Sequence, residues 1–439
     1  MRSLDKFEKK RLMSYRNFSL MYFTKNERLD DITSLFHEQL KGKKGDSRLW
    51  RAIKLLLENL IASDDKLVSI PLDRAKLYKT PSRYNPARIS PIHLRKIVNY
   101  LSERDYIEKE GHVCFADFKV PTRIRSKKKL KWLLRSTGLS IETLGFDRDM
   151  EPIVLKSKTK YMDRKSKKYK KFQKKQKHNK KIDYHETTRT KRMRKFLKSY
   201  NIFLKKQKFT IGQKQVDVFF RRIFNEDFRS GGRFYASFQS LKSSMDKCEE
   251  HEMSREELYI DGEETVEIDY SGMHINMLYI KSTGELYKGD DVYTVKNYEQ
   301  YRNVFKVCLQ VVINSSSKTA ASRGINNHLR KINCGLKAAE LLALFEDKHE
   351  EISEYFYSGA GLRLQYLESK VAERIFKYFY SKAIPILSVH DSFIAPISYK
   401  DELIEQMKES SKVVVGQALD IDIKEKSGSY KQDYSKLAA

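Results

Sequence analysis

Two short apolar runs each end in an aspartate, and these two carboxylates are the strongest candidates for chemistry in the chain. Residues 266–279 read VEIDYSGMHINMLY and residues 386–396 read ILSVHDSFIAP, which places Asp269 and Asp391 where a buried strand would meet a turn. Two aspartates that converge in this way can hold two divalent metal ions. Either run alone is also common in ordinary folds, so its surroundings decide the interpretation.

A cationic segment lies between the two aspartates. Residues 301–315 (YRNVFKVCLQVVINS) have the pattern of a helix, on which Arg302 and Lys306 are four residues apart and share one face. Fixed cations suit the β- and γ-phosphates of a nucleotide, and a lysine beside a leaving group can act as a general acid.

The elements that would position these residues alternate between strands and helices. From Val216 onward we expect an α+β arrangement. The expected order is a strand at 266–269, helices around 273–282, 298–313 and 362–380, a strand at 386–390 and a helix at 400–410.

The charge of the chain indicates a polyanionic partner. The 439 residues carry a formal net charge of +29. Residues 156–208 hold 23 Lys or Arg against the three acids Asp163, Asp183 and Glu186. Nucleic acid is the first candidate, because each neutralised phosphate releases counterions, and an anionic membrane surface is the rival. The basic segment is interpreted as a clamp on a phosphate backbone, with a solvated flexible arm as the alternative.

Targeting and cysteine patterns favour the cytoplasm. No run of about 18 apolar residues occurs, and the first 20 residues lack the apolar core of a signal peptide. The four cysteines lie far apart without CxxC spacing, which disfavours disulfides and structural zinc.

The first third of the chain has its own helical pattern. Apolar residues recur with helical period in 48–63 and 90–103, and a β-like stretch follows at 106–113. This order resembles a winged helix-turn-helix, with 90–104 as the recognition helix carrying His93, Arg95 and Lys96. An ordinary helical bundle is the other interpretation that the pattern allows.

The residues around the two aspartates resemble those of a known group of enzymes. Ile268-Asp269-Tyr270-Ser271 and His390-Asp391-Ser392 are similar to motifs A and C of the family-A DNA polymerases and the phage-type single-subunit RNA polymerases. Those families share a right-hand palm with fingers and thumb. The resemblance implies two Mg²⁺ ions held by Asp269 and Asp391, with the main-chain carbonyl of Ile268 or Tyr270 assisting.

Three further segments extend the resemblance over roughly 222–397. Residues 301–315 look like the fingers helix, which implies that Arg302 and Lys306 grip the incoming triphosphate. Residues 230–239 (SGGRFYASFQ) resemble a TGR…LQ segment, and 364–376 (LQYLESKVAERIF) resembles a helix that reaches the template duplex. The implied primer and template contacts are Arg233, Gln239, Gln365 and His390.

The chain also departs from the families' pattern. His274 stands where the DNA enzymes have a glutamate that excludes ribose, so the choice of sugar is open. Asn314-Ser315 replaces a Tyr-Gly pair on which the nucleotide stacks. The implied nucleotide-binding residues are therefore Arg302, Lys306, His274, Tyr270 and Asn314. The interval between the aspartates is short, which implies reduced fingers, and no acidic cluster indicates a proofreading exonuclease.

These observations predict four parts: an extension (1–27), a helical or winged-helix domain (28–125), a basic thumb-like segment (126–215) and a palm with fingers (216–439). The leading hypothesis is a small DNA-dependent DNA polymerase without proofreading that uses primer-template DNA, nucleoside triphosphates and Mg²⁺. Such small palms fit replication or repair of a mobile genetic element. The alternatives are an RNA polymerase or primase on the same palm, and a non-enzymatic DNA-binding replication or mobile-element protein.

Overall fold

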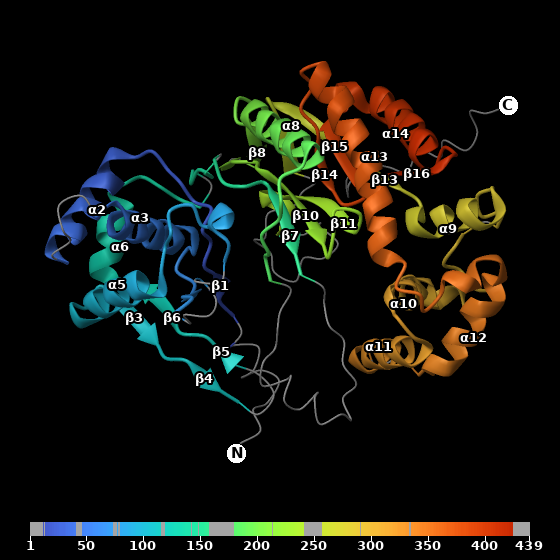
Figure 1. Cartoon of the computed structure of the whole chain (residues 1–439), viewed down its shortest axis with the longest axis horizontal. Coiled ribbons are helices and arrows are strands. Elements are labelled where there is room, and N and C mark those ends of the chain that lie inside the picture. The colour runs from blue at the N-terminus through green and yellow to red at the C-terminus, as the bar shows by residue number, and fades with distance from the viewer. Residues whose placement is uncertain are drawn as a thin grey trace. The chain divides into compact units, whose positions relative to one another are not determined.

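A computed structural model describes most of the chain. The described residues are 12, 14–40, 46–72, 77, 80–115, 119–141, 143–147, 149–157, 180–212, 214–240, 257–289, 291–332 and 335–424. The protein belongs to the α+β class, as predicted, and divides into two compact units (Figure 1). Unit 1 comprises Met1–Pro152, Thr159–Lys206 and Gln213–Phe219, and unit 2 comprises Ile153–Lys158, Gln207–Gly212 and Phe220–Ala439.

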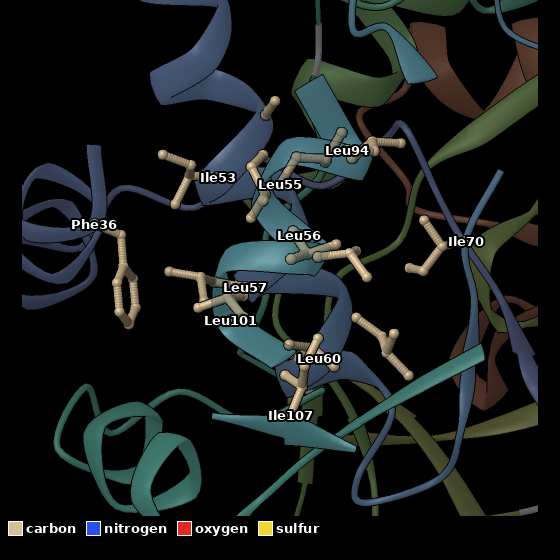
Figure 2. Close-up of a cluster of buried hydrophobic side chains, with 14 of the residues drawn as sticks. Phe36, Ile53, Leu55, Leu56, Leu57, Leu60, Ile70, Leu94, Leu101 and Ile107 are labelled. Carbon is tan, nitrogen blue, oxygen red and sulfur yellow. The ribbon is translucent and has the colours of Figure 1, made fainter. Parts of the chain in front are cut away.

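Unit 1 is built around the apolar helix α3. Its elements are β1 (Arg16–Asn17), α2 (Glu27–Gln39), α3 (Ser47–Ala62), β2 (Val68–Ser69), α5 (Pro91–Glu103), β3 (Ile107–Glu110), β4 (Val113–Cys114), β5 (Lys119–Val120), β6 (Arg123–Ser126), α6 (Lys128–Arg135), α8 (Thr188–Leu204) and β9 (Lys214–Val216). Figure 2 shows leucines and isoleucines of α3 meeting those of α5 and β3, together with Phe36 of α2. The helices predicted at 48–63 and 90–103 are confirmed.

Local capping explains where these helices begin. Asp46 caps α3 by accepting a hydrogen bond from the Leu49 amide, and Ser90 caps α5 in the same way, with Pro91 at the first helical position. After α5 the chain forms β3, which pairs antiparallel with β6 in a sheet of order β1-β2-β6-β3. The short β4 and β5 pair with each other between β3 and β6.

The described part of the basic segment ends in helix α8. The core of that segment, 158–179, lies outside the described residues. A capping box at Thr187 and Thr190 starts α8, and Arg194 on its first turns binds the carboxylates of Glu151 and Glu186. Arg83 also pairs with Glu186, so a network of ion pairs joins the 80s loop to the start of α8.

In the described part of the chain, unit 2 contains two sheets and six α-helices. Its elements are β7 (Ile153–Lys156), β8 (Phe209–Ile211), β10 (Phe220–Asn225), β11 (Gly231–Ala236), β12 (Leu258–Ile260), β13 (Glu263–Tyr270), α9 (Met273–Thr283), α10 (Arg302–Asn314), α11 (Lys318–Lys331), α12 (Ala338–Lys348), α13 (Gly361–Ser381), β14 (Leu387–Val389), β15 (Ser392–Pro396), α14 (Lys400–Val415) and β16 (Ile421–Lys424), with a 3-10 helix at Glu350–Tyr355.

The two sheets of unit 2 have different neighbours. The smaller one has the order β11-β10-β7, and α13 packs against β11. The larger one runs β14-β15-β13-β12-β8 within this unit, and β16 pairs with the end of β13. Figure 1 shows α10, α11 and α12 as one helical group.

Most elements predicted for the second half are confirmed. The strands near 266–269 and 386–390 and the helices near 273–282, 298–313, 362–380 and 400–410 are β13, β14, α9, α10, α13 and α14. Helices α11 and α12 were not predicted. In the described part of the chain, no helix is both long and apolar enough to cross a membrane.

Candidate active site

The structure brings Asp269 and Asp391 together on neighbouring strands. Asp269 is the penultimate residue of β13 and lies opposite Ser392, the first residue of β15, in the antiparallel register. Asp391 immediately precedes β15, and its carbonyl accepts a hydrogen bond from the Tyr270 amide at 3.4 Å. Two aspartates remote in sequence therefore lie side by side at one end of this strand pair, close enough for the charge of Asp391 to act on Asp269.

A tight turn presents Asp391. Strands β14 and β15 pair antiparallel with Val389 opposite Ser392, so only His390 and Asp391 connect them. His390 has a left-handed backbone with a φ of 62°. Such a conformation is unfavourable for a residue with a Cβ and is found disproportionately at functional sites.

The environment of Asp269 is unfavourable for a charged carboxylate. Its side chain is 25% exposed, and the buried Oδ1 atom has no hydrogen-bond partner among the described residues. Burial, followed by the charge of Asp391, raises the pKa of Asp269 to about 6, although Lys424 acts in the opposite direction. A buried oxygen without a partner leaves room for a ligand that the chain does not supply, such as a water molecule or a cation.

Strand β16 contributes two charged residues that the sequence did not indicate. Asp422 lies directly opposite Asp269 in the register, so both side chains belong to the same face of the sheet. Lys424 Nζ lies 3.3 Å from Asp269 Oδ2 and 2.7 Å from Glu267 Oε1. Glu267 also accepts a hydrogen bond from the Ser392 hydroxyl at 2.6 Å. In the sequence, the one sign that these side chains share a face of the sheet is their spacing: Glu267 and Asp269 are two residues apart, as are Asp422 and Lys424.

A buried glutamate joins two of the predicted contact residues. Glu368, on α13, is 2% exposed and accepts hydrogen bonds from Arg233 of β11 and from His274 Nε2 at 2.8 Å. Burial opposes ionisation of Glu368, but His274 and Arg233 outweigh it and lower its pKa below the ordinary value. Burial likewise opposes the charge of Arg233, yet Glu368 and then Asp391 raise its pKa. The Glu368 cluster, defined as Glu368, Arg233 and His274, therefore lies within electrostatic reach of Asp391.

The predicted cationic helix is α10, and Tyr293 connects it to the aspartates. The Tyr293 ring lies 5.6 Å from the Arg302 guanidinium and 5.5 Å from Lys306 Nζ. Burial and then the charges of Asp391 and Asp291 raise the pKa of Tyr293 to about 12. Arg302 forms a two-point ion pair with Asp291, with Nε–Oδ2 and Nη2–Oδ1 distances of 2.9 Å.

Two of the remaining predictions need correction or restriction. The Tyr270 side chain is 3% exposed and its hydroxyl donates to the Met407 carbonyl at 2.6 Å, so it is a core residue and is not available to a nucleotide. This correction arises because side chains alternate along β13, and Tyr270 points to the face opposite Asp269. Asn314 ends α10, three turns from Arg302, where its amide donates to the Gln310 carbonyl.

The other predicted residues are placed as follows. Ile268 is fully buried in β13, which pairs with β15 on one side and β16 on the other. Binding of a metal ion by its main-chain carbonyl stays a prediction. His390 packs edge-on against Tyr235, with 5.7 Å between ring centroids. Gln365 is half-buried on α13, one turn before Glu368. The side chain of Gln239 lies outside the described residues.

The donor set at this site suits a hard divalent cation. Carboxylate oxygens are the protein ligands that Mg²⁺ prefers, usually one or two of them together with water and substrate phosphates. Asp269 and Asp391 supply such a pair, and the unpartnered Oδ1 of Asp269 is consistent with it. Within the described ranges, no three His, Cys, Asp or Glu side chains gather as a metal site made of protein ligands alone.

Comparison with known proteins shows a distant structural likeness. No family model matches the chain, and no curated protein matches it. A solved structure of the polymerase domain of Pol1 from M. smegmatis, in complex with DNA primer-template and dNTP, superposes with a TM-score of 0.32 and 10% sequence identity. The match covers 54% of this chain and 50% of that chain, or about half of each. A likeness this distant does not assign the chain to a family.

Proposed function

We propose that this protein is a template-directed nucleotidyltransferase, namely a small DNA polymerase, with Asp269 and Asp391 at its catalytic centre. The observation that carries the proposal is the convergence of these two carboxylates, one with a buried unpartnered oxygen, beside the cations of α10. In this proposal β13, β14 and β15 belong to a palm, and α10 to α12 serve as short fingers.

Asp269 and Asp391 would hold two Mg²⁺ ions, with the carbonyl of Ile268 or Tyr270 as a further ligand. When bound, the metal pair would activate the primer 3′-hydroxyl and neutralise the triphosphate and the departing pyrophosphate. The raised pKa of Asp269 supports this role, because a bound cation would offset the repulsion from Asp391 that now disfavours its charge.

The remaining residues would bind and orient the substrates. Arg302 and Lys306 are exposed on one face of α10, where they could hold the β- and γ-phosphates, and Lys306 could give a proton to the pyrophosphate. The Glu368 cluster would set the position of the sugar and the primer terminus through His274 and Arg233. His390 and Gln365 would contact the duplex.

Unit 1 and the basic segment would supply most of the grip on nucleic acid. The exposed face of α5 carries Ile92, Arg95 and Lys96, which is the face that a winged helix would present to a major groove. Exposed cations continue on α8 at Arg189, Lys191, Arg192 and Lys195. Binding through such cations should weaken steeply as salt rises.

An extension assay tests the proposal. The protein is incubated with Mg²⁺, primed or unprimed DNA template and either dNTPs or NTPs. We expect primed extension with dNTPs, a loss of at least about 1,000-fold in Asp269→Asn and Asp391→Asn, and retained DNA binding in both variants. Asp401→Asn, in the exposed first turn of α14, is the matched control and should extend normally.

The other outcomes identify the alternatives. Extension only with NTPs, or initiation without a primer, would assign the site to an RNA polymerase or primase. This alternative is favoured by one observation, namely that His274, bound to Glu368, stands where the DNA enzymes carry the glutamate that excludes ribose. DNA binding with no incorporation of any nucleotide would instead leave a non-enzymatic DNA-binding protein.

A further inference from the structure

Helix α6 of unit 1 exposes a tryptophan. Trp132 is 70% exposed, whereas Leu130 and Leu134, two residues before and after it, are 0% and 6% exposed. At 3.6 residues per turn these leucines lie on the face opposite Trp132 and attach the helix to the core. The indole is therefore not part of the core, although covering a tryptophan removes 150–250 Å² from water.

Exposed cations share this helix face with the indole by their spacing, and the ammonium of one of them, Lys129, lies 4.2 Å from the centroid of the Tyr106 ring. Lys128 and Lys129 lie four and three residues before Trp132, and Arg135 lies three residues after it. All three side chains are exposed. We call Lys128, Lys129, Trp132 and Arg135 the α6 cluster. In the described part of the chain, neither Lys128 nor Arg135 forms an ion pair. By contrast, Lys127, which precedes the helix as its N-cap, pairs with Asp105, and Lys131, on another face of the helix, pairs with Asp65.

A fourth cation lies at the end of the helix. The guanidinium of Arg28, an exposed residue of α2, donates to the Ser136 hydroxyl at 3.3 Å, directly after α6. An exposed aromatic plane flanked by cations matches the chemistry of a nucleotide, because the indole can stack on the base and the cations can meet the phosphates. In a duplex the base faces are already stacked on one another, so this arrangement favours a single strand.

We propose that the α6 cluster is a binding site for single-stranded nucleic acid. One base stacks on Trp132, and the adjoining phosphates pair with Lys128, Lys129 and Arg135. The site goes beyond the proposed polymerase function and does not depend on it, since no residue of unit 2 takes part. The rival occupant is an anionic lipid surface, which also attracts tryptophan and lysine.

The chain offers a direct optical test, because it contains only two tryptophans. The other, Trp50, donates its indole N–H to the Ser34 hydroxyl at 3.1 Å and is partly buried on α3. In a Trp50→Phe variant of the full chain, Trp132 is the sole tryptophan. Titration with fluorescein-labelled oligothymidylate should quench its emission in parallel with the rise in anisotropy of the label. The reciprocal variant Trp132→Phe should show no such quenching of Trp50.

Binding variants separate stacking from charge. Trp132→Ala should weaken oligothymidylate binding about 5- to 100-fold, and Trp132→Phe, which keeps an aromatic face, should stay within about threefold of wild type. Replacing Lys128, Lys129 and Arg135 by Ala should lower the slope of log affinity against log salt by about two. The matched control replaces Lys408 and Lys412, two exposed lysines of α14, and should leave the slope unchanged. Circular dichroism confirms that each variant is folded.

Three results would overturn the proposal. The anisotropy could rise while Trp132 emission stays constant, which would place the oligonucleotide elsewhere on the chain. Phosphatidylserine vesicles could change Trp132 emission while oligothymidylate does not, which would assign the cluster to membranes. Finally, the full chain could bind no oligothymidylate at low salt. The Asp269→Asn variant should quench like wild type, so loss of polymerase activity and loss of this site are distinguishable.

Discussion

The two units bury carboxylates in different ways. In unit 1, Glu58 of α3 is 0% exposed, but it accepts hydrogen bonds from the Thr24 amide at 2.7 Å and from Arg51 at 3.0 Å. In unit 2, Asp269 has a buried oxygen without a partner and lies beside a second aspartate. Burial raises the pKa of both groups, but only Asp269 also has a carboxylate as its second-largest influence.

This is the difference that we expect between a structural carboxylate and a functional one. A buried carboxylate with its hydrogen bonds satisfied stabilises one arrangement of the chain around it. A buried carboxylate that lacks hydrogen-bond partners and lies next to a like charge destabilises the fold. Such a group is retained where a bound ligand offsets this cost. Accordingly, substitutions around Glu58 should act mainly on stability, and those around Asp269 mainly on binding and turnover.

The largest stability effect is expected in the core of unit 1. Leu56 is fully buried at the centre of α3 (Figure 2), so Leu56→Ala should lower the free energy of unfolding by about 3 kcal/mol through lost burial and a residual cavity. Urea unfolding monitored by circular dichroism measures it. Leu35→Ala, at a leucine of α2 that is 44% exposed, is the control and should change stability by less than about 0.5 kcal/mol. Equal effects of the two substitutions would contradict the assigned core.

A paired substitution on α13 tests the distinction within unit 2. Glu368→Gln removes the charge that holds Arg233 and His274, so we expect a 10- to 100-fold loss in kcat/KM for nucleotide addition, which corresponds to about 1.4–2.7 kcal/mol. The control is Glu373→Gln, which removes the partner of the buried Arg222. It should lower stability but leave kcat/KM unchanged. If both variants lost stability and neither changed kcat/KM, the Glu368 cluster would be structural.

The pH dependence of stability gives the next largest effect. The pKa of Asp269 is raised from 3.8 to about 6, so the folded state binds this proton more tightly than the unfolded state does. The resulting stability is present below pH 3.8 and is lost as pH rises through about 6. Asp269→Asn removes this dependence. Without metal, the variant's advantage over wild type should be about 1–2 kcal/mol larger at pH 8 than at pH 4.5, after allowance for partial exposure.

Magnesium adds a second arm to this measurement. At pH 8, Mg²⁺ should raise the unfolding temperature of wild type and EDTA should reverse it, because binding to the folded state alone stabilises it. Asp269→Asn and Asp391→Asn should show little of this shift. A pH-independent difference between wild type and Asp269→Asn, with no response to Mg²⁺, would mean that Asp269 is an ordinary buried residue.

The sequence predicted the elements of the site better than its contacts. The strands bearing Asp269 and Asp391 and the helix bearing Arg302 and Lys306 follow from apolar periodicity, which depends only on neighbouring residues. Helix α11 was not predicted because only three apolar residues, Ala321, Ile325 and Leu329, form its buried face, and most of its other residues are polar.

The contacts that were missed join elements far apart in the chain. Glu368 looks like any polar residue of an amphipathic helix, and the resemblance indicated Gln365, one turn earlier, as the contact residue. Lys424 reaches Asp269 only because β16 pairs with the end of β13, and Tyr293 lies in a loop without periodicity. These tertiary pairings cannot be predicted from charge or spacing in the sequence. The hydrogen bonds and strand register of the structure show them.

The smallest effect concerns two similar ion pairs, one in each unit. Arg302 binds Asp291 through Nε and Nη2 in unit 2, and Arg125 binds Glu108 through the same two nitrogens in unit 1. Both arginines are more than 40% exposed, so Arg→Lys at either should change stability by about 1 kcal/mol or less. Because only Arg302 faces the proposed triphosphate site, Arg302→Lys should also weaken dNTP binding about three- to tenfold, since lysine cannot reproduce the fork. Equilibrium titration with a fluorescent dNTP measures this, and equal affinities in the two variants would remove Arg302 from the nucleotide site.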